Sequence, residues 1–351
     1  GDVYKRQTLH YAGDFPDKLQ EDTNLDGETD RWVKYQGGEP SIIEDDTNHD
    51  GRRDVRAVFA SDGSKSLEEQ DTKHDGKFDV AIHYEKGEKV RVEEDTTGNK
   101  KKDVVTHYRR GQIVRREADT SGDGHFDSVA YFEKGKERRQ TPDKDGDGKL
   151  ELVIYLDEKG EKEREELDTK AAGQPDIVRF FAGGSRVREE EDQNGDRKPD
   201  VITTYDGDVP LLREADTNLD GRKDTVIQYR DGKKVSQEED RNSDGKKDAR
   251  YTFDAKERVE IERLDEDHDG HFELTNIHSG GKLQRRNTIA KKSKQIERSE
   301  FFEKGKLVRV ELDENADGNV DLWNHHTADG KLTRQEQDSN HDGKIDTWVK
   351  L

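Results

Sequence analysis

The chain has 351 residues, of which 27% are hydrophobic and 42% are charged, and its formal net charge is -21. Soluble domains usually carry nearly half apolar residues, so this composition excludes one large hydrophobic core. The excess of acid disfavours nucleic acid and anionic membrane surfaces as partners and favours cations. The absence of cysteine excludes disulfides and thiolate metal sites. No apolar run approaches the roughly 20 residues that span a bilayer.

A repeat runs through almost the whole sequence. Residues 1–7 fit no later pattern, and we expect them to be a non-native or disordered leader. From residue 8 to residue 351 we expect one continuous array, because acidic segments such as Asp22–Asp30 (DTNLDGETD) recur fourteen times at spacings of 24 or 25 residues. A fixed period in this range is typical of repeat architectures.

Each acidic segment is followed by five residues rich in β-branched and aromatic side chains, such as Val80–Tyr84 and Val201–Tyr205, which predict a strand. A turn with glycine and a second strand then lead into the next acidic segment. We therefore predict an all-β fold of about 29 short strands. Tandem hairpins of 24–25 residues would form an elongated, twisted meander ribbon or solenoid, with the acidic loops along one edge. A two-sheet solenoid, with one strand of each repeat in each sheet, is the alternative.

Three repeats carry one extra residue between the acidic loop and the turn glycine, which is Gly63, Gly160 or Gly330. The acidic loop keeps its internal spacing in these repeats. We therefore place the extra residue in the hairpin turn.

The acidic loops share one pattern, counted from the first acid. They have Asp at position 1, Asn or Asp at 3, Asp at 5, Gly at 6 and an acid at 9. A hard cation such as Ca²⁺ takes six to eight oxygen ligands, and alternate side chains of a tightly curled loop can converge on one point. The alternative is that Asp, Asn and Gly are only turn residues that bond their own backbone. The repetition of the full pattern favours the metal interpretation.

The loops resemble the D-x-D-x-D-G-x-x-D calcium loops of integrin-type propellers, dockerins and thrombospondin type 3 repeats. The resemblance covers the loops alone, and it implies Ca²⁺ as the bound cofactor. An EF-hand is excluded because position 12 falls within a predicted strand, as at Val33, Ala57 and Ile82.

Ten loops keep oxygen-bearing side chains at positions 1, 3, 5 and 9, when Ser121 is counted as a weak ligand. Ten bound Ca²⁺ ions would bring the net charge of the chain from -21 to about -1. The loop that begins at Asp192 has Arg197 in place of the usual glycine, which puts its bend in doubt. The predicted metal ligands are Asp22, Asn24, Asp26, Asp30; Asp46, Asn48, Asp50, Asp54; Asp119, Ser121, Asp123, Asp127; Asp143, Asp145, Asp147, Glu151; Asp192, Asn194, Asp196, Asp200; Asp216, Asn218, Asp220, Asp224; Asp240, Asn242, Asp244, Asp248; Asp265, Asp267, Asp269, Glu273; Asp313, Asn315, Asp317, Asp321; and Asp338, Asn340, Asp342, Asp346.

The other four loops lack ligands and carry lysines instead, such as Lys73, Lys170 and Lys291. We expect these sites to be empty or weak, with an ammonium group supplying the charge compensation that the missing metal would give. These loops begin at Asp71, Asp95, Asp168 and Ile289.

The fifth residue of the first strand of a repeat is aromatic in ten repeats. A hydrophobic seam is the favoured interpretation, and a sugar-binding ladder is the alternative. These residues are Tyr35, Phe59, Tyr84, Tyr108, Phe132, Phe181, Tyr205, Tyr229, Phe253 and Phe302.

An enzyme is not expected, because catalysis needs one asymmetric constellation and nearly every polar residue here recurs in each repeat. His325 and His326 are the one unusual local pair. The position-4 histidines are expected to point into solvent, and they are His49, His74, His268 and His341.

We predict an extracellular or cell-surface structural protein, bacterial in style, whose calcium-stiffened repeats form a stalk, fibre or filament. Self-association by head-to-tail strand pairing is expected, because an open strand edge is a template for another chain. One alternative is a calcium-dependent adhesin that binds carbohydrate or another cell surface. A second alternative is calcium sequestration or mineral nucleation.

Overall fold

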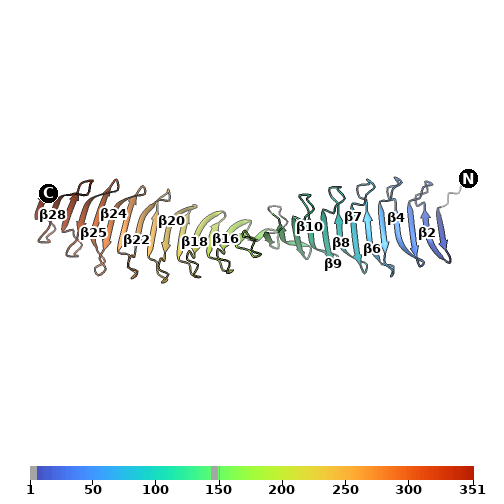
Figure 1. The fold of residues 1–351 in the computed structure, drawn as a ribbon, viewed down its shortest axis with the longest axis horizontal. Coiled ribbons are helices and arrows are strands. Elements are labelled where there is room, and N and C mark those ends of the chain that lie inside the picture. The colour runs from blue at the N-terminus through green and yellow to red at the C-terminus, as the bar shows by residue number, and fades with distance from the viewer. Residues whose placement is uncertain (1–5, 144–148, 150) are drawn as a thin grey trace. The chain divides into compact units, whose positions relative to one another are not determined.

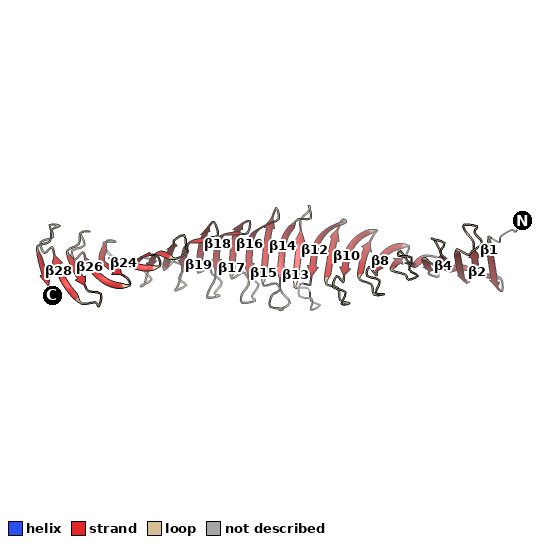
Figure 2. Cartoon of the chain, turned by 90° about the horizontal axis from the view of Figure 1, so that it is seen from above, coloured by secondary structure: helices blue, strands red, loops and turns tan. Residues whose placement is uncertain are grey.

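The computed structural model describes residues 6–143, 149 and 151–351. These residues form 29 strands, and there is no helix among them (Figure 2). Accordingly, this part of the chain contains no helix of the length and apolarity needed to cross a bilayer. The chain divides by its internal contacts into two units, Gly1–Pro175 and Asp176–Leu351.

The strands of the first unit are β1 (Gln7–Ala12), β2 (Phe15–Glu21), β3 (Arg31–Gln36), β4 (Glu39–Asp45), β5 (Val55–Phe59), β6 (Lys65–Gln70), β7 (Val80–Glu85), β8 (Glu88–Glu94), β9 (Val104–Arg109), β10 (Gln112–Ala118), β11 (Ser128–Glu133), β12 (Lys136–Pro142), β13 (Leu152–Leu156) and β14 (Lys162–Leu167). The strand β1 begins at Gln7, the last residue of the segment that was expected to be a leader.

The strands of the second unit are β15 (Ile177–Ala182), β16 (Ser185–Glu191), β17 (Val201–Asp206), β18 (Val209–Ala215), β19 (Thr225–Arg230), β20 (Lys233–Glu239), β21 (Ala249–Phe253), β22 (Val259–Leu264), β23 (Leu274–Ser279), β24 (Lys282–Ile289), β25 (Ile296–Glu303), β26 (Lys306–Leu312), β27 (Leu322–His326), β28 (Leu332–Gln337) and β29 (Thr347–Lys350).

Within each unit, every strand pairs antiparallel with its neighbours in the sequence (Figure 1). In the first unit β2 pairs with β1 and with β3, and in the second unit β28 pairs with β27 and with β29. The prediction of an all-β hairpin meander is confirmed. The two-sheet alternative is wrong, because both strands of a repeat are hydrogen-bonded in one sheet.

The meander places the acidic loops at one edge of each unit and the hairpin turns at the other. Most hairpins turn over two residues of positive φ, as at Lys86 (φ 50°) and Gly87 (φ 80°). This is the type I′ geometry that matches the twist of paired strands. In a longer repeat, residues 60–64 connect β5 to β6, and Ala60 N–H donates to the carbonyl of Ser64 at 2.8 Å. The extra residue therefore lies in the turn, as predicted.

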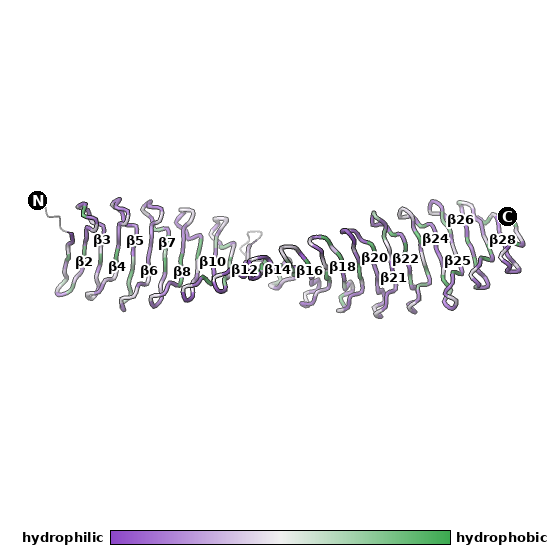
Figure 3. The backbone as a smooth tube through the Cα atoms, turned by 180° about the vertical axis from the view of Figure 1, so that it is seen from behind, coloured by the Kyte–Doolittle hydropathy of each residue, from purple (hydrophilic) through white to green (hydrophobic). Residues whose placement is uncertain are grey.

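A single layer of strands has no interior between two sheets, so burial in each unit is concentrated beside the acidic loops. Among the described residues thirteen apolar side chains are buried, against seventeen aspartates, and every one of these aspartates occupies loop position 1 or 9. Several of the buried apolar residues follow position 9 directly, among them Val104, Val201 and Ala249. In Figure 3 the hydrophobic residues form only short stretches along the backbone tube, between longer hydrophilic ones. Buried carboxylates at the loop bases thus replace part of a hydrophobic core.

Ion pairs and rings cover the sheet faces. Arg91 pairs with Glu93 at 2.7 Å, and the same spacing recurs along several second strands. All ten aromatic residues that the repeat places at the fifth strand position are half-buried. Lys89 Nζ lies 4.1 Å from the ring centroid of Tyr108, and the guanidinium of Arg186 lies 4.0 Å from that of Tyr205. A cationic group therefore covers these rings, whereas a sugar-binding ladder would need exposed ring faces on which a sugar could stack.

Candidate metal site: the acidic loop edge

The first acidic loop shows how position 1 holds the loop closed. Asp22 accepts hydrogen bonds from Leu25 N–H on Oδ1 at 2.6 Å and from Gly27 N–H on Oδ2 at 2.9 Å. The bond from the amide of position 6 recurs in twelve loops, at 2.6–2.9 Å. Since buried amides need acceptors, this carboxylate satisfies the backbone at the bend.

Position 9 holds the start of the loop. Asp30 Oδ2 accepts hydrogen bonds from Thr23 N–H at 2.7 Å, from Thr23 Oγ1 at 2.8 Å and from Asn24 N–H at 3.1 Å. Burial alone would raise the pKa of Asp30, but the hydrogen bonds from Thr23, His49 and Asn24 lower it to about 2. The Asp30 carboxyl is therefore ionised at neutral pH, the form in which it can ligate a cation.

Positions 3 and 5 are more exposed and shape the turn. In the first loop Asn24 Oδ1 accepts from Asp26 N–H at 2.9 Å, and Asp26 Oδ1 accepts from Glu28 N–H at 2.7 Å. Asn24 also donates from Nδ2 to Asp26 Oδ2 at 2.8 Å. These are the side-chain to backbone bonds of Asx turns. The turn chemistry and the oxygen ligand set thus reside in the same four side chains.

Two loops that were predicted to be empty keep the buried pair. Asp71 and Asp79 are both buried in one, and Asp95 and Asp103 in the other, although position 3 is Lys73 in the first and Thr97 in the second. Positions 1 and 9 are therefore part of the loop fold itself. Positions 3 and 5 are where these loops lose ligands.

The bend requires left-handed backbone at two positions. Position 6 is usually glycine, as at Gly27 (φ 97°), but Arg197 (φ 69°) and Lys100 (φ 71°) adopt the same conformation. Arg197 N–H donates to Asp192 Oδ2 at 2.8 Å, so the bend that was in doubt is formed. Position 4 is left-handed as well, for example at Leu25 (φ 72°), which the sequence pattern did not reveal.

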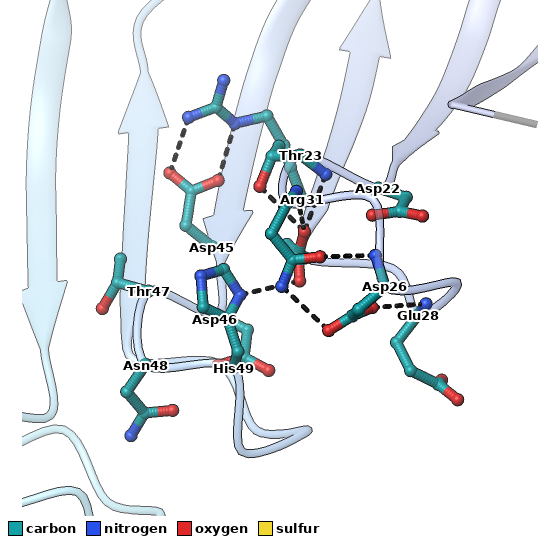
Figure 4. Close-up of polar contacts among 12 residues, drawn as sticks. Asp22, Thr23, Asp26, Glu28, Arg31, Asp45, Asp46, Thr47, Asn48 and His49 are labelled. Atoms are coloured by element: carbon teal, nitrogen blue, oxygen red, sulfur yellow. Dashed lines mark hydrogen bonds and ion pairs between the residues drawn. The ribbon is translucent and has the colours of Figure 1, made fainter.

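The position-4 histidines are exposed, as expected, but they also make a contact between loops that the sequence pattern did not predict. Each of them contacts the position-9 aspartate of the preceding loop, and His49 is seen beside the first loop in Figure 4. The distances from Nδ1 to Oδ1 are 2.9 Å for His49 and Asp30, 3.3 Å for His74 and Asp54, 3.0 Å for His268 and Asp248, and 2.7 Å for His341 and Asp321. The left-handed backbone at position 4 turns the histidine towards the preceding loop. The repeat period places the position-9 aspartate of that loop within reach of the ring.

In the part of the chain that the structure describes, two loops bring three carboxylates close enough for one cation. The nearest oxygens of Asp46, Asp50 and Asp54 lie within 4.8 Å of one another. The oxygens of Asp265, Asp267 and Asp269 do so in the second unit. Oxygen ligands at such separation suit a hard cation after small side-chain rotations.

A cleft of about 490 Å³ lies between the first two loops. It is lined from one side by Asp26, Glu28 and Asp30 and from the other by Asp46 and Asp50. Acidic groups of successive loops thus face one another across solvent. The negative potential there favours cations.

The predicted ligands fall into two groups in the structure. Most described ligands at positions 1 and 9 are buried, whereas most of those at positions 3 and 5 are exposed. Asp145 and Asp147 lie outside the described residues, so the loop that begins at Asp143 is described only in part.

Lysines of the ligand-poor loops make contacts both within a loop, as between Lys77 and Asp75 at 3.3 Å, and between loops. Lys73 Nζ donates to the carbonyls of Asp95 and Thr96 in the next loop, at 2.8 and 3.2 Å. Lys102 Nζ donates to the carbonyl of Asp79 in the preceding loop at 3.1 Å. Lys73 and Lys102 thus bond to backbone carbonyls across loop boundaries.

His325, one of the two adjacent histidines, makes a contact that also occurs in another repeat. His325 Nε2 lies 2.9 Å from Glu336 Oε2, and His107 makes the same kind of cross-strand contact with Glu117 at 3.0 Å. This arrangement belongs to the repeat.

No known protein family and no curated protein matches the chain. Several solved structures share weak similarity. One TcdB2–TccC3 structure matches with 14% identity and a TM-score of 0.21 over 94% of this chain and 24% of its own. TarM of S. aureus matches with 15% identity and a TM-score of 0.19 over 31% of this chain and 19% of its own. A porin-like protein from Bacteroides uniformis matches with 9% identity and a TM-score of 0.17, over 72% and 91% of the two chains. The match covers about a quarter of the TcdB2–TccC3 chain and about a fifth of the TarM chain, and similarity at this level carries no argument about function.

Proposed function

We propose that the chain is a non-enzymatic, calcium-stabilised structural repeat protein that works outside the cell or on its surface. The observation that carries the proposal is the convergence of the Asp46, Asp50 and Asp54 carboxylates within 4.8 Å, in a loop pattern that recurs along the chain. Calcium-binding loops of extracellular modules bind near 0.1 to 1 mM, a concentration reached outside cells.

Calcium would supply stability that the sheet cannot obtain from a core. Each unit is one layer of strands, and its most buried side chains include carboxylates that repel one another. At free calcium ten times the Kd, one site adds about 1.4 kcal/mol to the folded state. Several such sites would rival the whole stability of an ordinary domain.

The test is a titration of the purified chain with calcium, followed by far-UV circular dichroism and thermal unfolding, against EDTA. We expect a large rise in the unfolding temperature with calcium and little with magnesium, because magnesium demands a smaller octahedral site. A chain that is equally stable in EDTA and in millimolar calcium would show that the loops are turns alone.

We also propose head-to-tail assembly through the end strands. Within the described residues β29 pairs only with β28, and its Trp348 and Val349 are 65% and 51% exposed. On β1 the side chains of Leu9 and Tyr11 are exposed as well. Strand addition would pair the free edges and cover these groups. Sedimentation and electron microscopy with calcium should show filaments, whereas a monodisperse monomer would contradict assembly.

The glycan-binding alternative has less support than the structural role. A stacking platform needs bare ring faces, but Tyr84, Tyr108, Tyr205 and Phe253 each have a lysine or arginine over the ring. Sequestration of calcium would use the same loops, and it differs by requiring no assembly into filaments.

A further inference from the structure

In one of the predicted calcium loops, the ammonium group of a lysine side chain contacts the predicted metal ligands. In the loop that begins at Asp265, oxygens of Asp265, Asp267 and Asp269 lie within 4.8 Å of one another. Lys291 Nζ lies 3.0 Å from Asp267 Oδ2 and 2.5 Å from Asp269 Oδ2. The ammonium group therefore bridges the side chains of positions 3 and 5.

The reason that Lys291 reaches back lies in the next loop. The segment at Ile289 does not form an acidic loop, because Ile289 itself pairs with Ile296 and extends the ladder of β24 and β25. Residues 290–295 then close a short turn, in which Ala290 N–H donates to the carbonyl of Gln295 at 2.8 Å. Lys291 is the second residue of this turn, beside the preceding acidic loop.

The remaining predicted ligand of the same loop has one carboxylate oxygen without a hydrogen-bond partner among the described residues. Glu273, at position 9, has a buried Oε2 with no hydrogen-bond partner among the described residues. Its other oxygen accepts from Glu266 N–H at 2.7 Å and from Asp267 N–H at 3.1 Å. Glu273, Asp267, Asp269 and Lys291 line a cleft of about 290 Å³. A carboxylate oxygen is thus available next to the site that the ammonium shares.

We propose that Lys291 is the resident cation of the loop Asp265–Glu273, so that this loop takes calcium only when the ammonium is removed. The inference rests on the proposed calcium function and changes its stoichiometry. The loop keeps its ligands but is filled by the chain itself, because an ammonium and a divalent cation cannot both lie between Asp267 and Asp269 without strong repulsion.

The loop that begins at Asp46 provides the contrast. It is followed by a loop with a lysine at the same position, Lys73, but that ammonium bonds to carbonyls of the loop at Asp95 and leaves the Asp46 carboxylates to a cation. A lysine at position 3 of the next loop is therefore not enough by itself to place an ammonium group at the ligands of the preceding loop. The short turn after β24 is what directs Lys291 backwards.

The test is a count of bound calcium ions by native mass spectrometry, on the full chain at saturating calcium. The variants are Lys291→Met, the neighbouring control Lys292→Met, and Lys291→Met combined with Asp269→Asn. Lys291 is 62% exposed, so its replacement should leave the strands intact, which far-UV circular dichroism checks. We expect Lys291→Met to bind one ion more than the wild type, Lys292→Met to match the wild type, and the double variant to lose the gain.

The outcomes separate this inference from the proposed function. Equal, nonzero counts for wild type and Lys291→Met would overturn the role of Lys291 and leave the calcium function standing. A wild type that binds no calcium, with Lys291→Met binding one ion, would support the role of Lys291 and overturn the general calcium function. No binding by either protein would overturn both.

Discussion

The imidazole Nδ1 of His49 lies 2.9 Å from Oδ1 of Asp30, nineteen residues earlier in the chain. The contact joins position 4 of one acidic loop to position 9 of the preceding loop. Asp30 in turn accepts three hydrogen bonds from the start of its own loop, at Thr23 and Asn24. Each loop with such a histidine is therefore tied to the previous one, so that loops along one edge of a unit are coupled rather than independent.

Position 1 and position 5 of a loop should respond differently to substitution. Asp46→Ala removes the acceptor of Gly51 N–H and Asp50 N–H, so it should destabilise the loop by about 2 kcal/mol even in EDTA. Asp50→Asn keeps an acceptor for Arg52 N–H and should cost one bound calcium with little effect in EDTA. Hydrogen exchange at the Gly51 amide measures the first effect and native mass spectrometry the second. Equal behaviour of both variants in EDTA would contradict the division between fold and ligand positions.

A ligand-poor loop should be repairable. Lys73→Asn restores the oxygen set with Asp71, Asp75 and Asp79, and we expect one more bound calcium ion than in the wild type. The matched control is Lys86→Asn, which makes the same charge change in a hairpin turn and at a left-handed position that asparagine tolerates. A gain in the control, or no gain at Lys73, would show that charge alone or some other feature governs binding.

Acid should weaken the second unit through Glu189. Burial by itself raises the pKa of Glu189, but the hydrogen bonds and charges of Arg179 at 2.6 Å and Arg186 at 3.1 Å outweigh burial and lower it. The stabilisation is thus present above the unfolded pKa of about 4.3 and is lost as pH falls through the lower folded pKa. Glu189→Gln should cost about 1–2 kcal/mol at pH 7, and the difference from wild type should vanish near pH 2. Urea unfolding in EDTA at both pH values measures the difference in the free energy of unfolding between the two proteins. A difference that does not depend on pH would refute the stabilising role of the ionised Glu189.

A lysine with left-handed backbone is strained, so its replacement by glycine should stabilise the loop. Lys100 has φ 71° at the bend position that glycine usually occupies, so Lys100→Gly should stabilise its loop by about 1 kcal/mol. Gly98, in the same loop, has φ 80° and no neighbouring atom within 4 Å of an added Cβ, so Gly98→Ala should destabilise by a similar amount through backbone strain alone. Thermal unfolding of both variants in EDTA gives the comparison. The same sign for the two changes would contradict the strain argument.

Much of the fold was predictable because a repeat displays its constraints many times. The β-branched and aromatic residues of segments such as Val201–Tyr205, the turn glycine at Gly87 and the unchanged spacing of the acidic loops led to the hairpin meander, and the observed register confirms it. The positions of the candidate ligands follow from the same pattern, since loop spacing is a local property of the chain.

The contacts between loops were decided by the tertiary structure. His49 and Asp30 meet because the antiparallel ladder brings loop edges of successive repeats side by side, and the sign of φ at position 4 then directs the ring backwards. Lys73 and Lys291 share one loop position, yet one reaches forward to carbonyls and the other back to carboxylates. Spacing in the sequence specifies which residues belong to one loop, but the direction of a long side chain depends on the local backbone and on its neighbours across the sheet edge.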